Sequence, residues 1–315
     1  MHKHLITLGF VGLYVALDAA SFIHPLHGLN ITPWNPAPAL GLVFLLRRGP
    51  GARPVLVGAV LLSEYLVRGV PFPWWDSVLS ALILAAGYLL LSEALVRRMS
   101  PSTLLDDRAA LLGWMLPVVF GTLLNSLVYV SSLHVLGLLP PGGWLTGVLQ
   151  FWVGDAVGIT VAMPLFWWLS GERGRLALRA ALVGWETLGY SLLGLLALWV
   201  AFGLGGDGGF KLFYFLFLPI VWASARQGMA GAIVSATLLQ VGVIAAVQLL
   251  DFSAVTVAEL QMLAVVMALI GFFIGGVVDE QRRTSDELRQ TLRLAAAGEM
   301  AGALAHELNQ PLTAM

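Results

Sequence analysis

The sequence predicts an all-α fold: a polytopic bundle of about ten membrane-spanning helices with both ends in the cytoplasm, followed by one cytoplasmic helix. Of the 315 residues, 58% are hydrophobic and only 11% are charged, and the mean hydropathy is +0.86. Soluble domains carry about 25% charged residues, and a water-soluble fold could not bury this much apolar surface. Apolar runs of roughly 20 residues, the length that crosses a bilayer, recur along the chain.

The composition excludes several classes of protein. The chain has no cysteine, which excludes disulfides, thiol catalysis and cysteine-ligated metal centres. Its net charge of −1 does not indicate a nucleic-acid partner. Residues 1–22 have a weakly basic start and an apolar stretch, so they match a signal peptide as well as a first helix. We interpret them as a retained helix, because its removal would upset the distribution of charge described below.

Ten apolar segments follow one another along the chain. The third and the eighth have about 15 residues and reach about 22 Å as helices. Because this is less than the ~30 Å hydrocarbon core, each is either tilted in a thinned bilayer or re-entrant. The second begins with Pro33, Pro36 and Pro38, so its outer part should not be regular helix. The segments span about residues 5–23, 31–46, 54–68, 75–96, 109–136, 144–169, 181–204, 210–225, 228–249 and 257–278.

The basic residues support an even number of spans. With the N-terminus in the cytoplasm, these segments place all but two of the 17 lysines and arginines on the cytoplasmic side, as the positive-inside rule requires. The two exceptions are Arg68 and Lys211. One span more or fewer would disrupt the pattern from that point onward, so we predict that both termini are cytoplasmic.

Polar residues inside the apolar segments are candidate functional residues, because a charged side chain there costs on the order of 2–3 kcal/mol even on a lenient scale. One interpretation is a polar pocket in the outer half of the bundle, for a cation, a proton or a small polar molecule. The alternative is a set of interhelical hydrogen bonds that fix the packing, and the sequence leaves both open. The candidates are Asp18, Trp34, Asn35, Glu64, Asn125 and Asp155.

Two other groups of side chains are interpreted as non-functional. His24, His27 and His134 map near the outer face, and the first two have a spacing that metals use. Without a fixed helix to present them, we predict no metal site. Glu93 lies one turn before Arg97, which favours a surface ion pair over ligand binding.

After Val278 the sequence becomes polar and helix-forming, and it predicts an amphipathic helix with one apolar stripe. Such a helix needs a partner, and a parallel homodimeric coiled coil or a four-helix bundle supplies one. The alternative is that the helix packs back on its own membrane domain. The apolar stripe consists of Leu288, Leu292, Ala296, Met300, Ala303 and Leu304.

The end of this helix carries the most specific motif in the chain. Residues 297–312 read AGEMAGALAHELNQPL, which resembles the H-box of the HisKA dimerisation and phosphoacceptor domain of sensor histidine kinases. The resemblance implies that His306 is the phosphoacceptor, that Glu307 acts as its base and that Gln310 assists dephosphorylation of the response regulator. The chemistry is consistent with these roles, because a neighbouring carboxylate that accepts one imidazole proton activates the other ring nitrogen as a nucleophile.

Three stretches of the membrane region resemble the bacterial membrane-associated sensor (MASE-type) domain. They are TPWNPAPAL at residues 32–40, FWVGDAVG at 151–158 with Met163-Pro164, and LPIVWASARQG at 218–228. The resemblance implies sensing at the bacterial inner membrane, and it would make the polar pocket the stimulus site.

These resemblances divide the chain into three parts. We predict an integral membrane sensor domain at 1–278, a coiled-coil-like linker helix at 279–293 and the N-terminal part of a HisKA helix at 294–315. They imply membrane lipid, a second copy of the chain and a response regulator receiver domain as partners. No nucleotide lid or phosphate-binding loop occurs in the sequence, so no cofactor is expected in this chain. ATP and Mg²⁺ are expected only with a catalytic domain that this sequence does not contain. Either His306 would accept phosphate in trans, or the chain is a truncated version of a longer kinase.

Two other classes of function remain as alternatives to a sensor histidine kinase. A transporter or channel-like protein with a regulatory cytoplasmic tail would explain broken helices and carboxylates within the membrane. An integral membrane enzyme is disfavoured because no nucleophile elbow is present. The tail favours signalling, since a transporter does not require the sequence HELNQPL.

Overall fold

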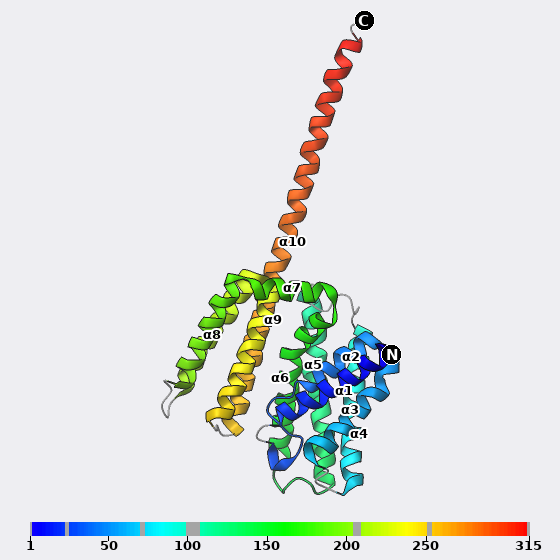
Figure 1. Cartoon of the computed structure of the whole chain (residues 1–315), viewed down its shortest axis with the longest axis vertical. Coiled ribbons are helices and arrows are strands. Elements are labelled where there is room, and N and C mark those ends of the chain that lie inside the picture. The colour runs from blue at the N-terminus through cyan, green and yellow to red at the C-terminus, as the bar shows by residue number, and fades with distance from the viewer. Residues whose placement is uncertain are drawn as a thin grey trace.

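The computed structural model of the chain describes residues 2–22, 25–69, 73–98, 108–203, 209–250 and 254–313. Within these ranges the chain is helical and has no strand, which confirms the all-α prediction. Figure 1 shows a bundle of helices from which the last helix projects far beyond the rest. In chain order the α-helices are α1 (His2–Ser21), α2 (Ala37–Arg48), α3 (Arg53–Arg68), α4 (Trp74–Arg98), α5 (Arg108–Val135), α6 (Trp144–Ser170), α7 (Glu172–Val183), α8 (Trp185–Gly203), α9 (Phe217–Leu250) and α10 (Ala254–Thr313).

In the described ranges, seven helices are long and apolar enough to cross a membrane: α1, α4, α5, α6, α8, α9 and α10. The chain is therefore a multi-pass membrane protein. The difference from the ten predicted spans has two causes. Helices α2 and α3 have only 12 and 16 residues, and α9 counts once although it covers two of the predicted segments.

Helix α9 reverses its direction at Gly228, whose φ of 62° and ψ of −142° are not helical and favour glycine. A Cβ on Gly231 would lie 2.1 Å from the carbonyl oxygen of Ala223, although residues eight apart in a straight helix are separated by about 12 Å. The two arms, 217–227 and 229–250, therefore run antiparallel. This turn confirms the predicted break between the eighth and ninth apolar segments.

Helix α7 was not predicted from the sequence. The segment expected at 181–204 begins at Trp185 instead, and the residues before it form a separate helix between Gly171 and Gly184, which both have extended backbone. The predicted start was wrong because the end of α7 is as apolar as the start of α8. Figure 1 shows α7 lying across the end of the bundle from which α10 leaves.

Basic side chains gather at that end of the bundle, which we call the α10 face. At the end of α2, the Arg47 Nε donates to the Oγ of Ser170 in the last turn of α6 (2.9 Å). Arg53, at the start of α3, pairs with Glu93 of α4 (2.8 Å). Glu93 also pairs with Arg97 (3.1 Å), which confirms the predicted surface ion pair.

Helix α6 is the centre of the bundle. In an 18-residue apolar stretch of α6, 67% of the residues are buried, against 22% to 44% in the corresponding stretches of the other spans. It packs against α2 on one side and against α9 and α10 on the other. A displacement of α6 would therefore be transmitted from the N-terminal helices to the helix that leaves the membrane.

Candidate functional site

An extended segment enters the bundle beside α6. Residues 29–36 are not helical, as their prolines predicted, and α2 begins only at Ala37. The backbone N–H of Asn35 donates to the carbonyl oxygen of Gly154 in α6 (3.1 Å). A Cβ on Gly154 would lie 2.0 Å from the carbonyl oxygen of Thr32. Glycine at this position therefore lets the extended segment lie directly against the helix.

Asp155, one residue further along α6, receives two hydrogen bonds. It is 1% exposed. The Asn35 amide donates to its Oδ1 (3.0 Å), and the Tyr88 hydroxyl from α4 donates to its Oδ2 (2.8 Å). Side chains of three elements therefore meet at one carboxyl group, which is the arrangement that a buried carboxylate requires.

Arg68, the last residue of α3, is the centre of a second group. Its side chain is 3% exposed. One guanidinium nitrogen donates to both oxygens of Asp18 in α1 (2.8 and 3.0 Å) and to the Oδ1 of Asn30 (2.5 Å). The other donates to Glu64, one turn earlier in α3 (3.2 Å). This charge is buried among its partners.

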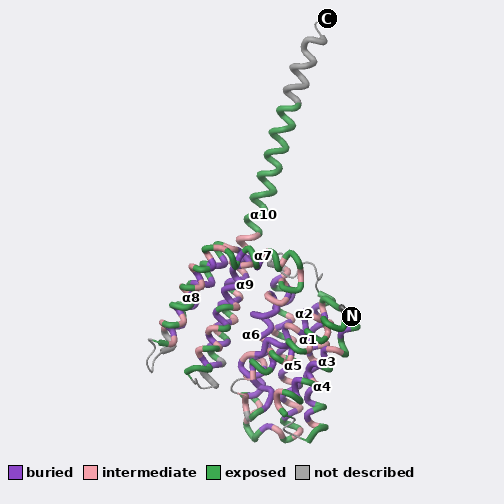
Figure 2. Tube along the Cα trace, viewed as in Figure 1, coloured by how far each residue is buried: buried purple, intermediate pink, exposed green. Residues whose placement is uncertain are grey.

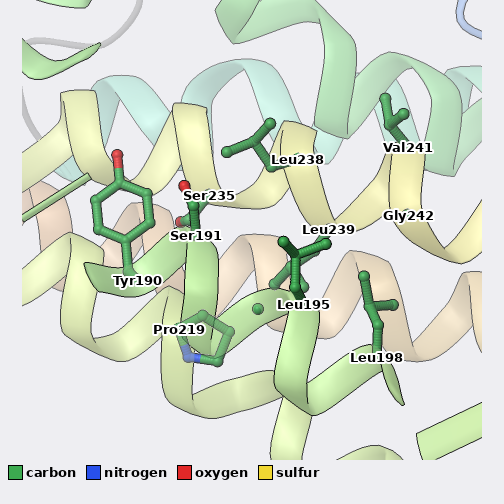
Figure 3. A pocket seen from close by; sticks show the side chains of 11 residues that line it. Tyr190, Ser191, Leu195, Leu198, Pro219, Ser235, Leu238, Leu239, Val241 and Gly242 are labelled. Atoms are coloured by element: carbon green, nitrogen blue, oxygen red, sulfur yellow. The ribbon is translucent and has the colours of Figure 1, made fainter. Parts of the chain in front are cut away.

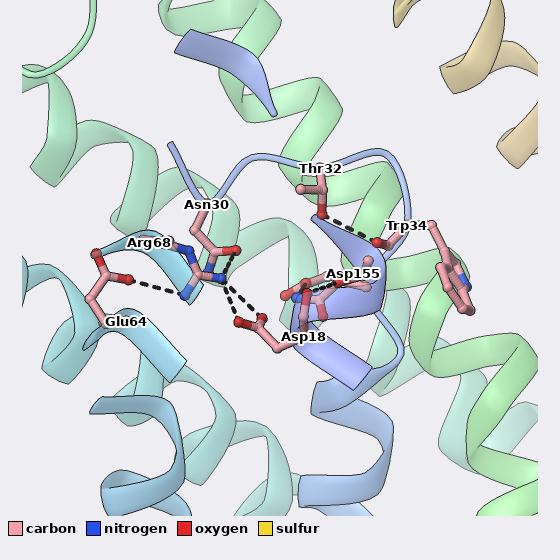
Figure 4. Close-up of polar contacts among 9 residues, drawn as sticks. Asp18, Asn30, Thr32, Trp34, Glu64, Arg68 and Asp155 are labelled. Atoms are coloured by element: carbon pink, nitrogen blue, oxygen red, sulfur yellow. Dashed lines mark hydrogen bonds and ion pairs between the residues drawn. The ribbon is translucent and has the colours of Figure 1, made fainter. Parts of the chain in front are cut away.

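The two groups form one continuous site, which we call the polar cluster. Asp18 and Asp155 are close enough to interact electrostatically, and Figure 4 shows both side chains beside the extended segment. The cluster contains three carboxyl groups and one guanidinium, so it has an excess of acidic groups. Its members are Asp18, Asn30, Asn35, Glu64, Arg68, Tyr88 and Asp155.

Four of the six predicted site residues meet in the polar cluster, and two do not. Trp34 belongs to the extended segment, but its indole points away from the ion pairs (Figure 4) and packs against the apolar core around α6. Asn125 lies against Gly87 in a groove of about 780 Å³ between α4 and α5. Its amide nitrogen has no hydrogen-bond partner in the described part of the chain.

Three members of the cluster were not predicted. Arg68 was only counted among the basic residues on the outer side, although its position four residues after Glu64 signals an ion pair on one helix face. Asn30 was not considered a site residue, and no sequence pattern marks Tyr88 among the other aromatic residues. His24 and the side chain of His27 lie outside the described residues, so the absence of a metal site at these histidines stays a prediction.

The family model MASE1 matches residues 5–282, which is most of the chain. The chain belongs to the MASE1 family of membrane sensor domains. The match contains every residue of the polar cluster, and no HisKA domain was detected. A search of curated proteins and a search of solved structures each found no match.

The last residues of the MASE1 domain connect α10 to the turn of α9. Asp279 of α10 accepts a hydrogen bond from the backbone N–H of Met229 (2.9 Å). It therefore caps the first turn of the second arm of α9, where a carboxylate is stabilising. Arg282 donates to the carbonyl oxygen of Arg226 at the end of the first arm (2.7 Å). A Cβ on Gly228 would lie 1.9 Å from the Asp279 Oδ1, so glycine makes this contact possible.

Beyond the MASE1 domain, α10 continues without interruption to Thr313. The structure does not show the alternative in which this helix packs back on the membrane domain, because residues 280–301 are all exposed (Figure 2). Leu288 and Leu292 of the apolar stripe are 59% and 61% exposed. His306, Glu307 and Gln310 belong to the helix, but their side chains lie outside the described residues.

Proposed function

We propose that this MASE1 chain is the membrane-sensing part of a sensor histidine kinase, and that it delivers its signal through α10 to His306. The observation that carries this proposal is the continuity of α10, which joins the sensor domain to the sequence HELNQPL in one 60-residue helix. In this proposal Glu307 activates His306 as a nucleophile, and Gln310 assists removal of phosphate from the receiver domain of a response regulator. Both termini are cytoplasmic, and α10 pairs with a second copy.

In this proposal the polar cluster is the stimulus site. Its excess of carboxyl groups favours a cation or a proton as the stimulus, because either one neutralises buried negative charge. Asp155 is the residue best placed to respond, since it joins the extended segment, α4 and α6. Loss of a hydrogen bond at Asp155 would shift α6, which packs directly against α10.

Phosphorylation of His306 tests the kinase part of the proposal. The chain in lipid nanodiscs would be incubated with radiolabelled ATP and a histidine-kinase catalytic domain supplied in trans. We expect acid-labile, alkali-stable label on the wild-type chain and none on His306→Gln. The variant His4→Gln is the control, because it removes a histidine from the opposite end of the sequence. Label that persists in His306→Gln, or no label on the wild type, contradicts the proposal.

The movement of α10 tests the sensor part. Since the natural chain has no cysteine, Gly51→Cys and Ser285→Cys would give a clean pair of spin-label sites on the bundle and on α10. We expect the distance distribution between the labels to change when pH or monovalent cation concentration is stepped. Asp155→Asn should abolish the change, whereas Glu93→Gln, which alters an exposed carboxylate, should leave it intact. An unchanged response in Asp155→Asn rules out the cluster as the stimulus site.

A transporter is the second candidate function, because the broken path of residues 29–36 and the buried carboxyl groups are also found at transport sites. Uptake of protons or monovalent cations into liposomes that contain the chain separates the two functions. The sensor proposal expects no flux above that of empty liposomes. Sustained flux that Asp155→Asn abolishes favours transport.

A further inference from the structure

Helix α7 has the composition of a helix that lies in the membrane surface. It carries three arginines, Arg173, Arg175 and Arg179, in 12 residues. Its apolar residues Leu176 and Leu182 are more than half exposed. A helix rich in arginine that also exposes leucines is typical of the boundary between headgroups and acyl chains. In this protein α7 lies across the α10 face (Figure 1).

Two of these arginines stand at the edge of an apolar groove. The groove has a volume of about 290 Å³ and lies between α6, α7 and the second arm of α9. Leucines from all three helices line it, among them Leu169, Leu182 and Leu238, together with Arg175 and Arg179. We call it the lipid groove. Arg173 and Glu172, which belong to the same helix, do not line it.

The charge of the lipid groove is complementary to an anion. Arg175 uses one guanidinium nitrogen to donate to the carbonyl oxygen of Leu169 (3.1 Å), and its side chain lines the groove. Arg179 makes no hydrogen bond or ion pair with the residues that the structure describes. Two guanidinium groups one helical turn apart therefore face an apolar groove at the membrane surface.

A second apolar groove adjoins the first across Leu238. It has a volume of about 280 Å³ and lies between α8 and α9. Figure 3 shows Leu238 and Leu239 on the α9 side of it and Leu195 and Leu198 on the α8 side. One anionic group and two neighbouring apolar grooves match the parts of a phospholipid, which has a phosphate and two acyl chains.

We propose that the lipid groove is a binding site for an anionic phospholipid, with the phosphate between Arg175 and Arg179 and one acyl chain along Leu169 and Leu238. Basic pockets between helices at the cytoplasmic surface bind such headgroups. This site is separate from the polar cluster and does not depend on the sensor proposal. It has a direct structural connection to the signalling helix, since the Gln227 amide, next to the turn that contacts α10, donates to the carbonyl oxygen of Ala181 in α7 (3.3 Å).

The test is native mass spectrometry of the purified chain, titrated with phosphatidylglycerol or with phosphatidylcholine of the same acyl chains. We expect the wild type to retain phosphatidylglycerol in preference to phosphatidylcholine. The double variant Arg175→Gln/Arg179→Gln should bind it about 30-fold more weakly, which corresponds to about 1 kcal/mol for each arginine. Arg173→Gln is the matched control, because it removes a charge from the same helix without altering the lipid groove.

A second variant keeps the test decisive if loss of both arginines destabilises the fold. Leu238→Trp retains every charge and fills the groove, so it should also weaken phosphatidylglycerol binding, whereas binding of a free phosphate would be unaffected. The proposal is overturned if phosphatidylcholine binds equally well, if Arg173→Gln loses as much binding as the double variant, or if Leu238→Trp binds phosphatidylglycerol as the wild type does.

Discussion

The polar cluster and the apolar stripe of α10 are opposite in character. In the cluster, charged groups are buried in the membrane domain and find their partners within the same chain, as Arg68 does with Asp18 and Glu64. In the stripe, leucines such as Leu288 and Leu292 are exposed, at 59% and 61%. The comparison teaches that the buried charges of the membrane domain are paired within one chain, whereas the apolar stripe of α10 is exposed and would be covered only by the pairing with a second copy that we propose.

The largest expected effect is that of removing the charge at the centre of the cluster. Arg68→Met should lower the free energy of unfolding by about 3–5 kcal/mol, because it leaves the Asp18 and Glu64 carboxylates buried without their cation. Thermal unfolding of the purified protein in detergent measures the change. A loss below about 1 kcal/mol is the size expected of an exposed ion pair. It would mean that water reaches the charged groups of the cluster.

The next effect tests whether the apolar stripe is a contact between two copies. Leu288→Gln/Leu292→Gln should weaken self-association at least about 100-fold, since each buried leucine contributes about 1.5–3 kcal/mol. Disulfide formation between copies that carry Ser285→Cys measures association. Leu294→Gln is the matched control, because Leu294 is equally exposed but lies off the stripe. If the control and the double variant associate equally, the stripe is not the interface.

A smaller effect is expected where α10 contacts the membrane domain, at the turn of α9. Gly228→Ala should cost about 1–3 kcal/mol, because alanine is strained at this backbone conformation and its Cβ would displace Asp279. In the labelled pair Gly51→Cys and Ser285→Cys, the same change should broaden the distance distribution. Gly298→Ala is the control, since no atom lies within 4 Å of its Cβ position. A distribution as narrow as that of the wild type would show that Asp279 does not hold α10 to the turn.

The smallest effect is expected for an exposed ion pair, which serves as the reference for the buried one. Arg97→Gln removes a charge from an ion pair in which Arg97 is 76% exposed, and it should change the free energy of unfolding by about 1 kcal/mol or less. When both variants are measured under the same conditions, the difference between their losses of unfolding free energy shows how much of the loss in Arg68→Met is due to burial. Equal losses for the two variants would remove the distinction between the buried and the exposed pairs.

Part of the fold and of the site follows from local sequence. The prolines at 33, 36 and 38 predicted an unwound segment before α2, and the gap between the apolar segments at 210–225 and 228–249 predicted the break within α9. Both predictions depend only on residues that are neighbours in the sequence. Asp18, Glu64 and Asp155 were recognised for a similar reason, since a carboxyl group within an apolar run is unusual wherever it lies in the bundle.

The sequence by itself determined the helical class, the repeated apolar segments and the amphipathic tail, because these properties depend on neighbouring residues and on their helical period. Only the tertiary structure decided which polar groups meet. Arg68 contacts Asn30 and Asp18, which are 38 and 50 residues away. In the sequence, its position at the end of an apolar segment does not distinguish it from an arginine at the membrane surface. The separation of α7 from α8 was likewise decided by the tertiary structure, since the apolar end of α7 is followed by the largely apolar α8 with only Gly184 between them.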